Sequence, residues 1–238
     1  MNAIEPAVVR VLEVPADYSV YELHLAIQVA LGYNDYEPFE FVRPGLTVGV
    51  EAAYAGAGIT HEGHRYRHAD ELEAGQLWRA VGQPLDYTYD FARLWGFKVT
   101  LQRRDESEAM LPRCVVSEGA APPEDVDSLE AYYGLLIAFA DPALDLHELA
   151  VQILGEDYDP SGSTAEEITE RLADLFAEEI EPHGAEPDDA YDWWDPSKYD
   201  EAMRLRVKRQ EIDRSLPESL DGLGAEEKHT ALLRALRN

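Results

Sequence analysis

One stretch, Tyr87–Arg104, constrains the fold of this chain more than any other. It contains two runs of β-forming residues, Tyr87–Phe91 and Trp95–Leu101, with only residues 92–94 between them. Aromatic and β-branched side chains suit a pleated, half-buried surface, and a three-residue connection favours a hairpin. We therefore predict a β-hairpin whose apolar side chains nucleate one face of a sheet. This is a scaffold signal, and it points to no reaction.

The length and composition of the chain allow a sizeable core. With 238 residues, 45% of them hydrophobic, it fits one domain with an appendage or two small domains. No run of 18 apolar residues occurs, so we expect no membrane span, and the first ten residues do not resemble a secretion signal. The single cysteine, Cys114, excludes an internal disulfide and a multi-cysteine zinc site. These features predict a cytoplasmic protein.

The charge of the chain is strongly acidic and unevenly spread. Lys and Arg total 20 against 48 Asp and Glu, a net charge of −28. Residues 101–200 hold 27 acids and 5 bases, whereas residues 201–238 hold 7 acids and 8 bases. Such a field repels phosphates, so we expect no binding to duplex DNA. The simpler explanation of the acidity is solubility or a salt-adapted proteome. The more specific alternative is that the acidic surface attracts a basic partner or imitates a nucleic acid.

The first half of the chain carries signals for one helix and several strands. Ser19 and Glu22 form a capping box, apolar residues follow at helical spacing, and Gly32 can end the helix. We therefore predict a helix over about 20–31. The expected strands are Val8–Val14, Phe39–Val42, Leu46–Val50 and a short one at Arg65–Arg67.

The second half reads as helical after an irregular segment around Pro122 and Pro123. Ser128 can cap a helix over about 129–140, expected to bury Tyr132, Leu135, Leu136 and Phe139. Two more helices are predicted, one from Asp141-Pro142 to Gly155 and one after the capping box of Thr164 and Glu167.

The last 60 residues differ in character from the rest. Residues 179–198 combine acids and prolines with Trp193 and Trp194, which we interpret as a linker that docks its tryptophans or presents them to a partner. Two short helices are expected near 199–215 and 225–236. The predicted organisation is an α+β domain over 1–178 and an acidic, aromatic linker with C-terminal helices over 179–238.

Two stretches carry a family resemblance. They are PAVVRVLEVPADYSVYELHLAIQVALGYNDYEPFEF, from Pro6 to Phe41, and RCVVSEGAAPPED, from Arg113 to Asp125. Together with YDFARLW they resemble the plasmid pRiA ORF-three-like family, whose members are often labelled TnpR-like passenger proteins of insertion elements. The resemblance covers about residues 4–178. It implies an α+β fold with a mainly antiparallel sheet and packed helices, and it implies no established activity.

The chain keeps some of the family's motif residues and departs at others. Of the Y-D-F-G-D-G-W pattern it keeps Tyr89, Asp90, Phe91 and Trp95 but replaces the glycine-rich turn, and of C-P-P-E-D-C-G-G it keeps the central four residues without the cysteines. We therefore expect any cysteine metal site of the family to be lost here. The candidate binding residues are Tyr89, Asp90, Trp95, Pro122, Pro123, Glu124, Asp125, Trp193 and Trp194.

Three groups of residues are candidates for a catalytic or metal site. Asp90 with Glu124 and Asp125 is the candidate carboxylate set for acid–base catalysis, against the simpler interpretation that these acids satisfy local backbone groups. His61, His64 and His68 share no convincing face, so we predict a solvated loop and no metal. A serine recombinase needs a nucleophilic serine amid arginines, and neither Ser19 nor Ser117 has arginines nearby in sequence.

The sequence therefore predicts a non-enzymatic interaction or regulatory protein without catalytic residues, cofactor or metal. Its partner is expected to be an unidentified protein with a basic surface, and neither duplex DNA nor a membrane. One alternative is an acidic mimic of DNA that inhibits a basic nucleic-acid-binding protein. The other is an enzyme that uses Asp90 with Glu124 and Asp125.

Overall fold

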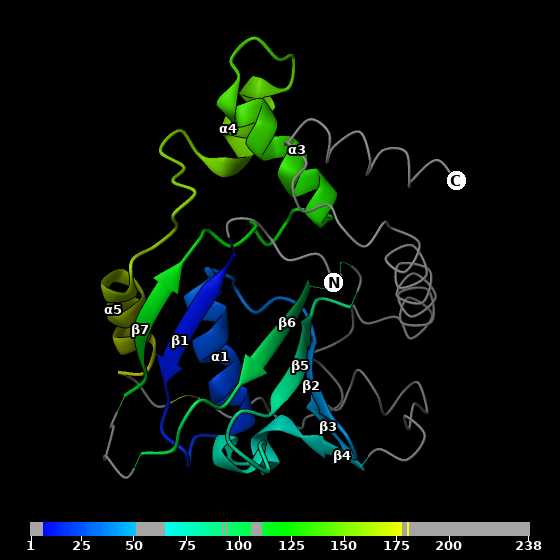
Figure 1. Ribbon diagram of the computed structural model, residues 1–238, viewed down its shortest axis with the longest axis vertical. Helices are drawn as coiled ribbons and strands as arrows, with labels where there is room; N and C mark the ends of the chain where they lie inside the picture. The colour runs from blue at the N-terminus through cyan, green and yellow to red at the C-terminus, as the bar shows by residue number, and fades with distance from the viewer. Residues whose placement is uncertain are drawn as a thin grey trace.

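Helix α1 (Val20–Leu31) lies between the two β-sheets of the computed structural model (Figure 1). The structure describes residues 7–50, 65–91, 93, 95–105, 111–177 and 180. One side of α1 packs on the larger sheet through Val20 and Leu23, and the other packs through Ala26 and Ala30 on the second sheet and a later helix. The predicted capping box of Ser19 and Glu22 is present, and Gly32 ends the helix at a φ of 80°.

The larger sheet holds five of the strands in the described part of the chain. They run in the order β4-β3-β2-β5-β6, and every neighbouring pair is antiparallel except β3 with β4. The prediction of an α+β fold with a mainly antiparallel sheet is thus confirmed. The strands are β2 (Phe39–Arg43), β3 (Leu46–Gly49), β4 (Arg65–His68), β5 (Pro84–Tyr89) and β6 (Trp95–Thr100). Two short 3-10 turns, Ala69–Glu71 and Ala74–Gln76, follow β4.

The predicted hairpin is formed by β5 and β6, with different bounds. The strands pair from Pro84 with Thr100 to Tyr89 with Trp95. The first strand begins three residues earlier than predicted and ends at Tyr89, because Asp90 takes a left-handed conformation with a φ of 56°. The connection is therefore five residues long.

The smaller sheet pairs β1 (Val9–Glu13) with β7 (Arg113–Glu118), which are about a hundred residues apart in sequence. Helix α5 (Ala165–Leu175) packs on β7, where the Thr169 hydroxyl accepts a hydrogen bond from the Cys114 amide at 3.0 Å. Arg10 joins three segments, since it donates to the carbonyl of Ala30 at 2.7 Å and to that of Gly119 at 2.9 Å.

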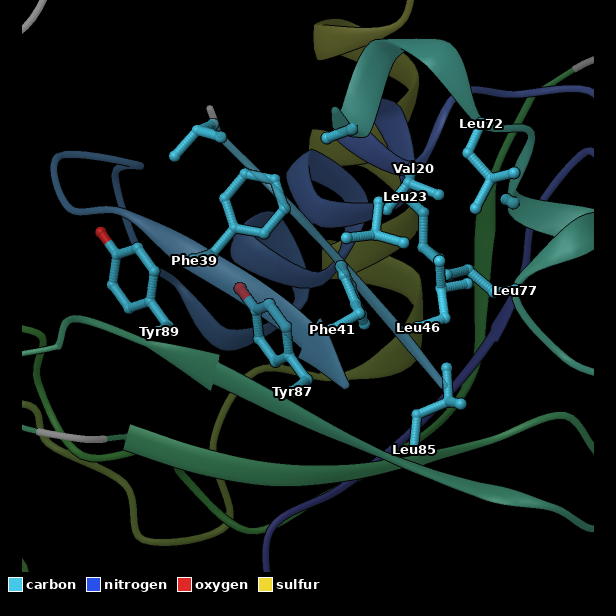
Figure 2. Close-up of a cluster of buried hydrophobic side chains, with 14 of the residues drawn as sticks. Val20, Leu23, Phe39, Phe41, Leu46, Leu72, Leu77, Leu85, Tyr87 and Tyr89 are labelled. Carbon is cyan, nitrogen blue, oxygen red and sulfur yellow. The ribbon is translucent and has the colours of Figure 1, made fainter. Parts of the chain in front are cut away.

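The main core lies between α1 and the larger sheet. Figure 2 shows the rings of Phe39, Phe41 and Tyr87 on the side of the strands that faces Val20 and Leu23 of α1. Phe41 and Tyr87 stack with their ring centres 4.6 Å apart. The predicted apolar residues of the hairpin contribute unequally. Phe91 and Trp95 are buried, whereas Phe97 and Val99 on the edge strand are only partly so.

Helices α3 (Leu129–Ala140) and α4 (His147–Leu154) form a separate pair beyond the ends of the strands, at the top of Figure 1. Ser128 caps α3 as predicted, and Gly155 ends the next helix as predicted. Two expectations are wrong. The helix expected from Asp141-Pro142 begins at His147, because residues 141–146 form turns, and the expected burial of Leu135, Leu136 and Phe139 is only partial.

Several predictions concern residues outside the described part of the chain. These are the linker 179–198 with Trp193 and Trp194, of which only Ile180 is described, the helices near 199–215 and 225–236, and the stretch containing His61 and His64. Of the helices that the structure does describe, none has the length and apolar run needed to cross a bilayer.

Candidate functional site

Four of the residues singled out by sequence lie around one end of the β5–β6 hairpin. Tyr89 and Trp95 are paired across the strands, and Asp90 begins the connection between them. Glu124, which is 34 positions after Asp90, reaches the same place by a hydrogen bond from the Tyr89 hydroxyl to its Oε1. Together with Tyr33, described below, we call Tyr89, Asp90, Trp95 and Glu124 the aromatic–carboxylate cluster.

Glu124 ties the segment after β7 to the loop after α1. Its Oε2 accepts hydrogen bonds from the backbone amide and the side-chain amide of Asn34, each at 2.9 Å. The Tyr89 hydroxyl in turn accepts from the amides of Tyr36 and Glu37, at 3.0 and 3.2 Å. Both Glu124 oxygens are therefore engaged by the chain itself, and the carboxylate joins three segments.

Asp90 is fully buried and holds the hairpin connection. Its Oδ1 accepts from the backbone amide of Arg93 at 3.0 Å, and its Oδ2 pairs with Arg93 Nη1 at 2.7 Å. This hydrogen bond and the nearby Asp90 charge raise the pKa of Arg93. The prediction that Asp90 satisfies its own hairpin is confirmed.

Tyr33 completes the cluster. Its ring stacks on Tyr89 with centres 5.6 Å apart, and 6% of the residue is exposed. Burial is the main cause that raises the pKa of Tyr33, and the negative charges of Glu124 and Asp90 raise it further. Burial and the hydrogen bond to Glu124 likewise raise the pKa of Tyr89. The structure thus brings Asp90 and Glu124 close to one tyrosine, with both carboxylates already committed.

The other residues singled out by sequence do not join this cluster in the same way. Pro122 is buried and Pro123 partly so, in the irregular segment that positions Glu124. Asp125 is exposed, so the adjacent pair Glu124 and Asp125 is divided between core and surface. Trp193 and Trp194 are outside the described residues.

A second buried polar network was not predicted from the sequence. His24 Nδ1 lies 2.8 Å from the Tyr87 hydroxyl, and its Nε2 lies 2.6 Å from Asp35 Oδ1. Gln28 also donates to the Tyr87 hydroxyl, at 2.8 Å. The Tyr87 hydroxyl accepts a hydrogen bond from Gln28 and can donate one to His24 Nδ1. His24 Nε2 then carries the ring proton and donates to Asp35. The available signal was two polar residues, four apart, on the buried face of an apolar helix.

A metal site finds little support in these side chains. Within the described ranges, no group of three His, Cys, Asp or Glu side chains could hold a metal ion. His68 ends β4, and its Nδ1 accepts a hydrogen bond from the Asp70 amide at 3.3 Å.

The α3–α4 pair carries a surface of a different kind. Leu146, Leu149 and Ile153 follow at spacings of three and four, so they share one side of α4, and we call them the α4 stripe. They are 60%, 46% and 41% exposed. Residues 129–162 contain seven Asp or Glu and no Lys or Arg. The apolar stripe therefore belongs to a segment of the chain that carries acids and no Lys or Arg.

The α3–α4 pair has specific internal contacts. Ala138 of α3 and Ala150 of α4 are 3% and 0% exposed, and the Phe139 ring lies against the rings of His147 and Tyr158. The His147 ring joins the two helices by a hydrogen bond to the carbonyl of Ala138 at 2.9 Å, and the Tyr132 and Tyr158 hydroxyls lie 2.6 Å apart. The exposed stripe is thus carried by a pair of helices with specific internal contacts.

Two sheets around one helix, with a helical pair beyond them, define an α+β protein. The chain belongs to the plasmid pRiA4b ORF-3-like protein family, whose sequence pattern matches residues 1–167.

Two proteins to which this chain is similar are described without an activity. The uncharacterised protein y4hQ of Sinorhizobium fredii is 27% identical over 179 residues, which covers 74% of this chain and 89% of that protein. The crystal structure of a protein of unknown function from Methanosarcina mazei Go1 is also similar, with a TM-score of 0.57 and 25% identity. This similarity covers 69% of this chain and 91% of that one.

Proposed function

We propose that this protein is a non-enzymatic interaction protein whose acidic α3–α4 pair binds a basic, amphipathic segment of a partner protein. The observation that carries the proposal is the α4 stripe, three exposed apolar side chains amid seven acids and no bases. A helix with apolar residues on one side and Lys or Arg beside them would cover the stripe and meet the acids.

The expected affinity is moderate. Full burial of an aliphatic side chain contributes about 1.5–3 kcal/mol, so covering the exposed half of three such side chains contributes about 1 kcal/mol each. Charge attraction must supply much of the remainder, and exposed charges are screened by salt. We therefore expect a micromolar complex that weakens as the salt concentration rises.

The two alternatives have less support. An acid–base enzyme would need carboxylates available to a substrate, whereas the oxygens of Glu124 and Asp90 accept hydrogen bonds from Tyr89, Asn34 and Arg93. A DNA mimic needs acids spaced along one face like phosphates, and the α4 surface interrupts its acids with leucine and isoleucine. We also propose that the protein acts in the cytoplasm and is associated with mobile elements. The second part is supported by the name of the family, which refers to a plasmid.

An 18-residue peptide of leucine and lysine with an amphipathic helical pattern is a suitable probe. We expect it to bind the full-length protein at micromolar concentration by fluorescence anisotropy, and Leu149→Ala/Ile153→Ala to weaken binding at least about tenfold, a loss of about 1.4 kcal/mol. Alanine keeps the helix propensity and removes only the apolar contact.

Two controls define the result. Val81→Ala/Val115→Ala removes apolar groups that are similarly exposed, 55% and 48%, but lie elsewhere, and should leave binding unchanged. A peptide with glutamate in place of every lysine should not bind. Equal binding by wild type and the Leu149→Ala/Ile153→Ala variant would contradict the proposal.

A further inference from the structure

The charge of the C-terminal segment is opposite to that of the α3–α4 pair. Residues 204–209 contain four Lys or Arg and no acid, in a chain whose net charge is −28. We propose that residues 201–216 of this chain occupy its own α4 stripe, so that the segment acts as an internal competitor of the partner. This inference rests on the proposed function, because it assigns the same surface a resident ligand.

The sequence of residues 201–216 has the required pattern. At helical spacing Leu205, Ile212 and Leu216 fall on one side, with Lys208 and Arg209 beside them. The α4 stripe offers the complement, with Leu149 and Ile153 one turn apart and acids at positions 145 and 148. Residues 201–216 hold five Lys or Arg against three acids, so their net charge is opposite to that of the α3–α4 pair.

The chain is long enough for this contact within one molecule. Twenty-three residues lie between Ala177, the last residue of the continuous described chain, and Glu201. A chain of that length spans at most about 80 Å when fully extended. A folded unit of about 177 residues has a radius of gyration of about 16 Å, so the segment can reach any part of its surface.

Tethering makes the competition effective. A segment linked in this way has an effective concentration of about 1 mM, so even an intrinsic dissociation constant of about 0.1 mM would leave the stripe mostly covered. An external partner would then bind about tenfold more weakly than to an open stripe. Partners with a strongly basic segment would then displace residues 201–216 and bind, whereas weakly basic partners would not.

Zero-length carbodiimide cross-linking tests the placement directly. It joins a lysine amine to a neighbouring carboxylate, and the chain has only four lysines, at positions 98, 198, 208 and 228. We expect Lys208 to couple to acids between residues 141 and 157 in the wild-type, full-length protein. Lys98 should couple to Asp86, with which it forms an ion pair, and this serves as the positive control.

Isotope mixing distinguishes contacts within a chain from contacts between chains. In an equal mixture of ¹⁴N- and ¹⁵N-labelled protein, the proposal predicts Lys208 cross-links of uniform labelling only. Mixed-label products would show that the segment binds a second copy, and would overturn the intramolecular assignment. Lys208 cross-links that are absent or lie elsewhere, with the Lys98 product present, would overturn it as well.

A charge-reversed segment separates this inference from the proposed function. Arg204→Glu/Lys208→Glu/Arg209→Glu should bind the leucine–lysine peptide about tenfold more tightly than wild type, because the competitor is released. Equal affinity of the two proteins would show that residues 201–216 do not compete for the α4 stripe, and the proposed binding surface would still stand. If neither protein binds the peptide, the binding surface itself is wrong.

Discussion

Tyr87→Ala should lower the free energy of unfolding by at least about 3–5 kcal/mol, the usual range for removing a buried large aromatic residue. Such a loss approaches the whole stability of a typical domain. Tyr87 is fully buried on β5, between β2 and the edge strand β6, and its ring stacks on Phe41. Its hydroxyl also satisfies His24 and Gln28, which would be left buried without this partner. Denaturant unfolding of the variant and wild type measures the effect.

Two further substitutions separate the ring from the hydroxyl. Tyr87→Phe keeps the ring and should cost about 1–3 kcal/mol for the lost hydrogen bonds. Tyr36→Ala removes a tyrosine that is 72% exposed and should stay within about 0.5 kcal/mol of wild type. If Tyr87→Ala changed the free energy of unfolding as little as Tyr36→Ala, Tyr87 would not belong to a packed core between α1 and the larger sheet.

The second large effect is a steep loss of stability at alkaline pH. Burial raises the pKa of Tyr33, Tyr87 and Tyr89 above the value of an unfolded tyrosine. The folded protein therefore keeps three protons that the unfolded chain releases above about pH 10. Their contribution is complete below pH 10 and is lost as the pH rises. Above about pH 10, each tyrosine lowers the free energy of unfolding by about 1.4 kcal/mol per pH unit. The three together lower it by about 4 kcal/mol per pH unit.

Tyr33→Phe is the sharpest test of this pH dependence. The Tyr33 hydroxyl has no hydrogen-bond partner among the described residues, so its removal should cost little at pH 7. Above pH 10 the variant should lose stability less steeply than wild type, by about 1.4 kcal/mol per pH unit. Unfolding followed by circular dichroism, with tyrosinate absorbance in parallel, measures both slopes. Identical alkaline slopes would mean that Tyr33 ionises freely in the folded state.

Local signals in the sequence predicted much of the fold. The capping boxes at Ser19 and Thr164 each place a helix start, because their hydrogen bonds involve residues only three apart. The hairpin was predicted for a similar reason, since its two strands are adjacent in sequence. Its bounds differed because Asp90 adopts a left-handed conformation, which no β-propensity scale anticipates.

The candidate site depended on contacts that sequence alone does not show. Glu124 and Tyr89 are 35 positions apart, and their hydrogen bond exists only once β5 and the segment after β7 are in place. The same holds for His24 and Tyr87, which are 63 positions apart. The resemblance selected Tyr89, Asp90, Trp95 and Glu124 but did not show that their carboxylates are committed to the chain's own donors.

The α3–α4 pair shows how an apolar pattern can mislead. Leucine and phenylalanine at helical spacing in α3 indicated a buried side, and the expected burial of Leu135, Leu136 and Phe139 followed from it. In the fold Tyr132 and Ala138 are the buried residues of α3, whereas these three side chains are only half-buried. Periodicity indicates that a helix has an apolar side, but what covers that side is decided by tertiary structure.

Amide hydrogen exchange of the full-length Arg204→Glu/Lys208→Glu/Arg209→Glu protein, whose α4 stripe is not covered by its own segment, tests the central claim most directly when measured with and without the leucine–lysine peptide, because it locates the bound peptide. The α4 stripe account predicts new protection in His147–Leu154 and the preceding turns, and no change in Tyr33–Glu37 or Tyr89–Arg93. Protection at the aromatic–carboxylate cluster instead, or no protection at saturating peptide, would contradict it.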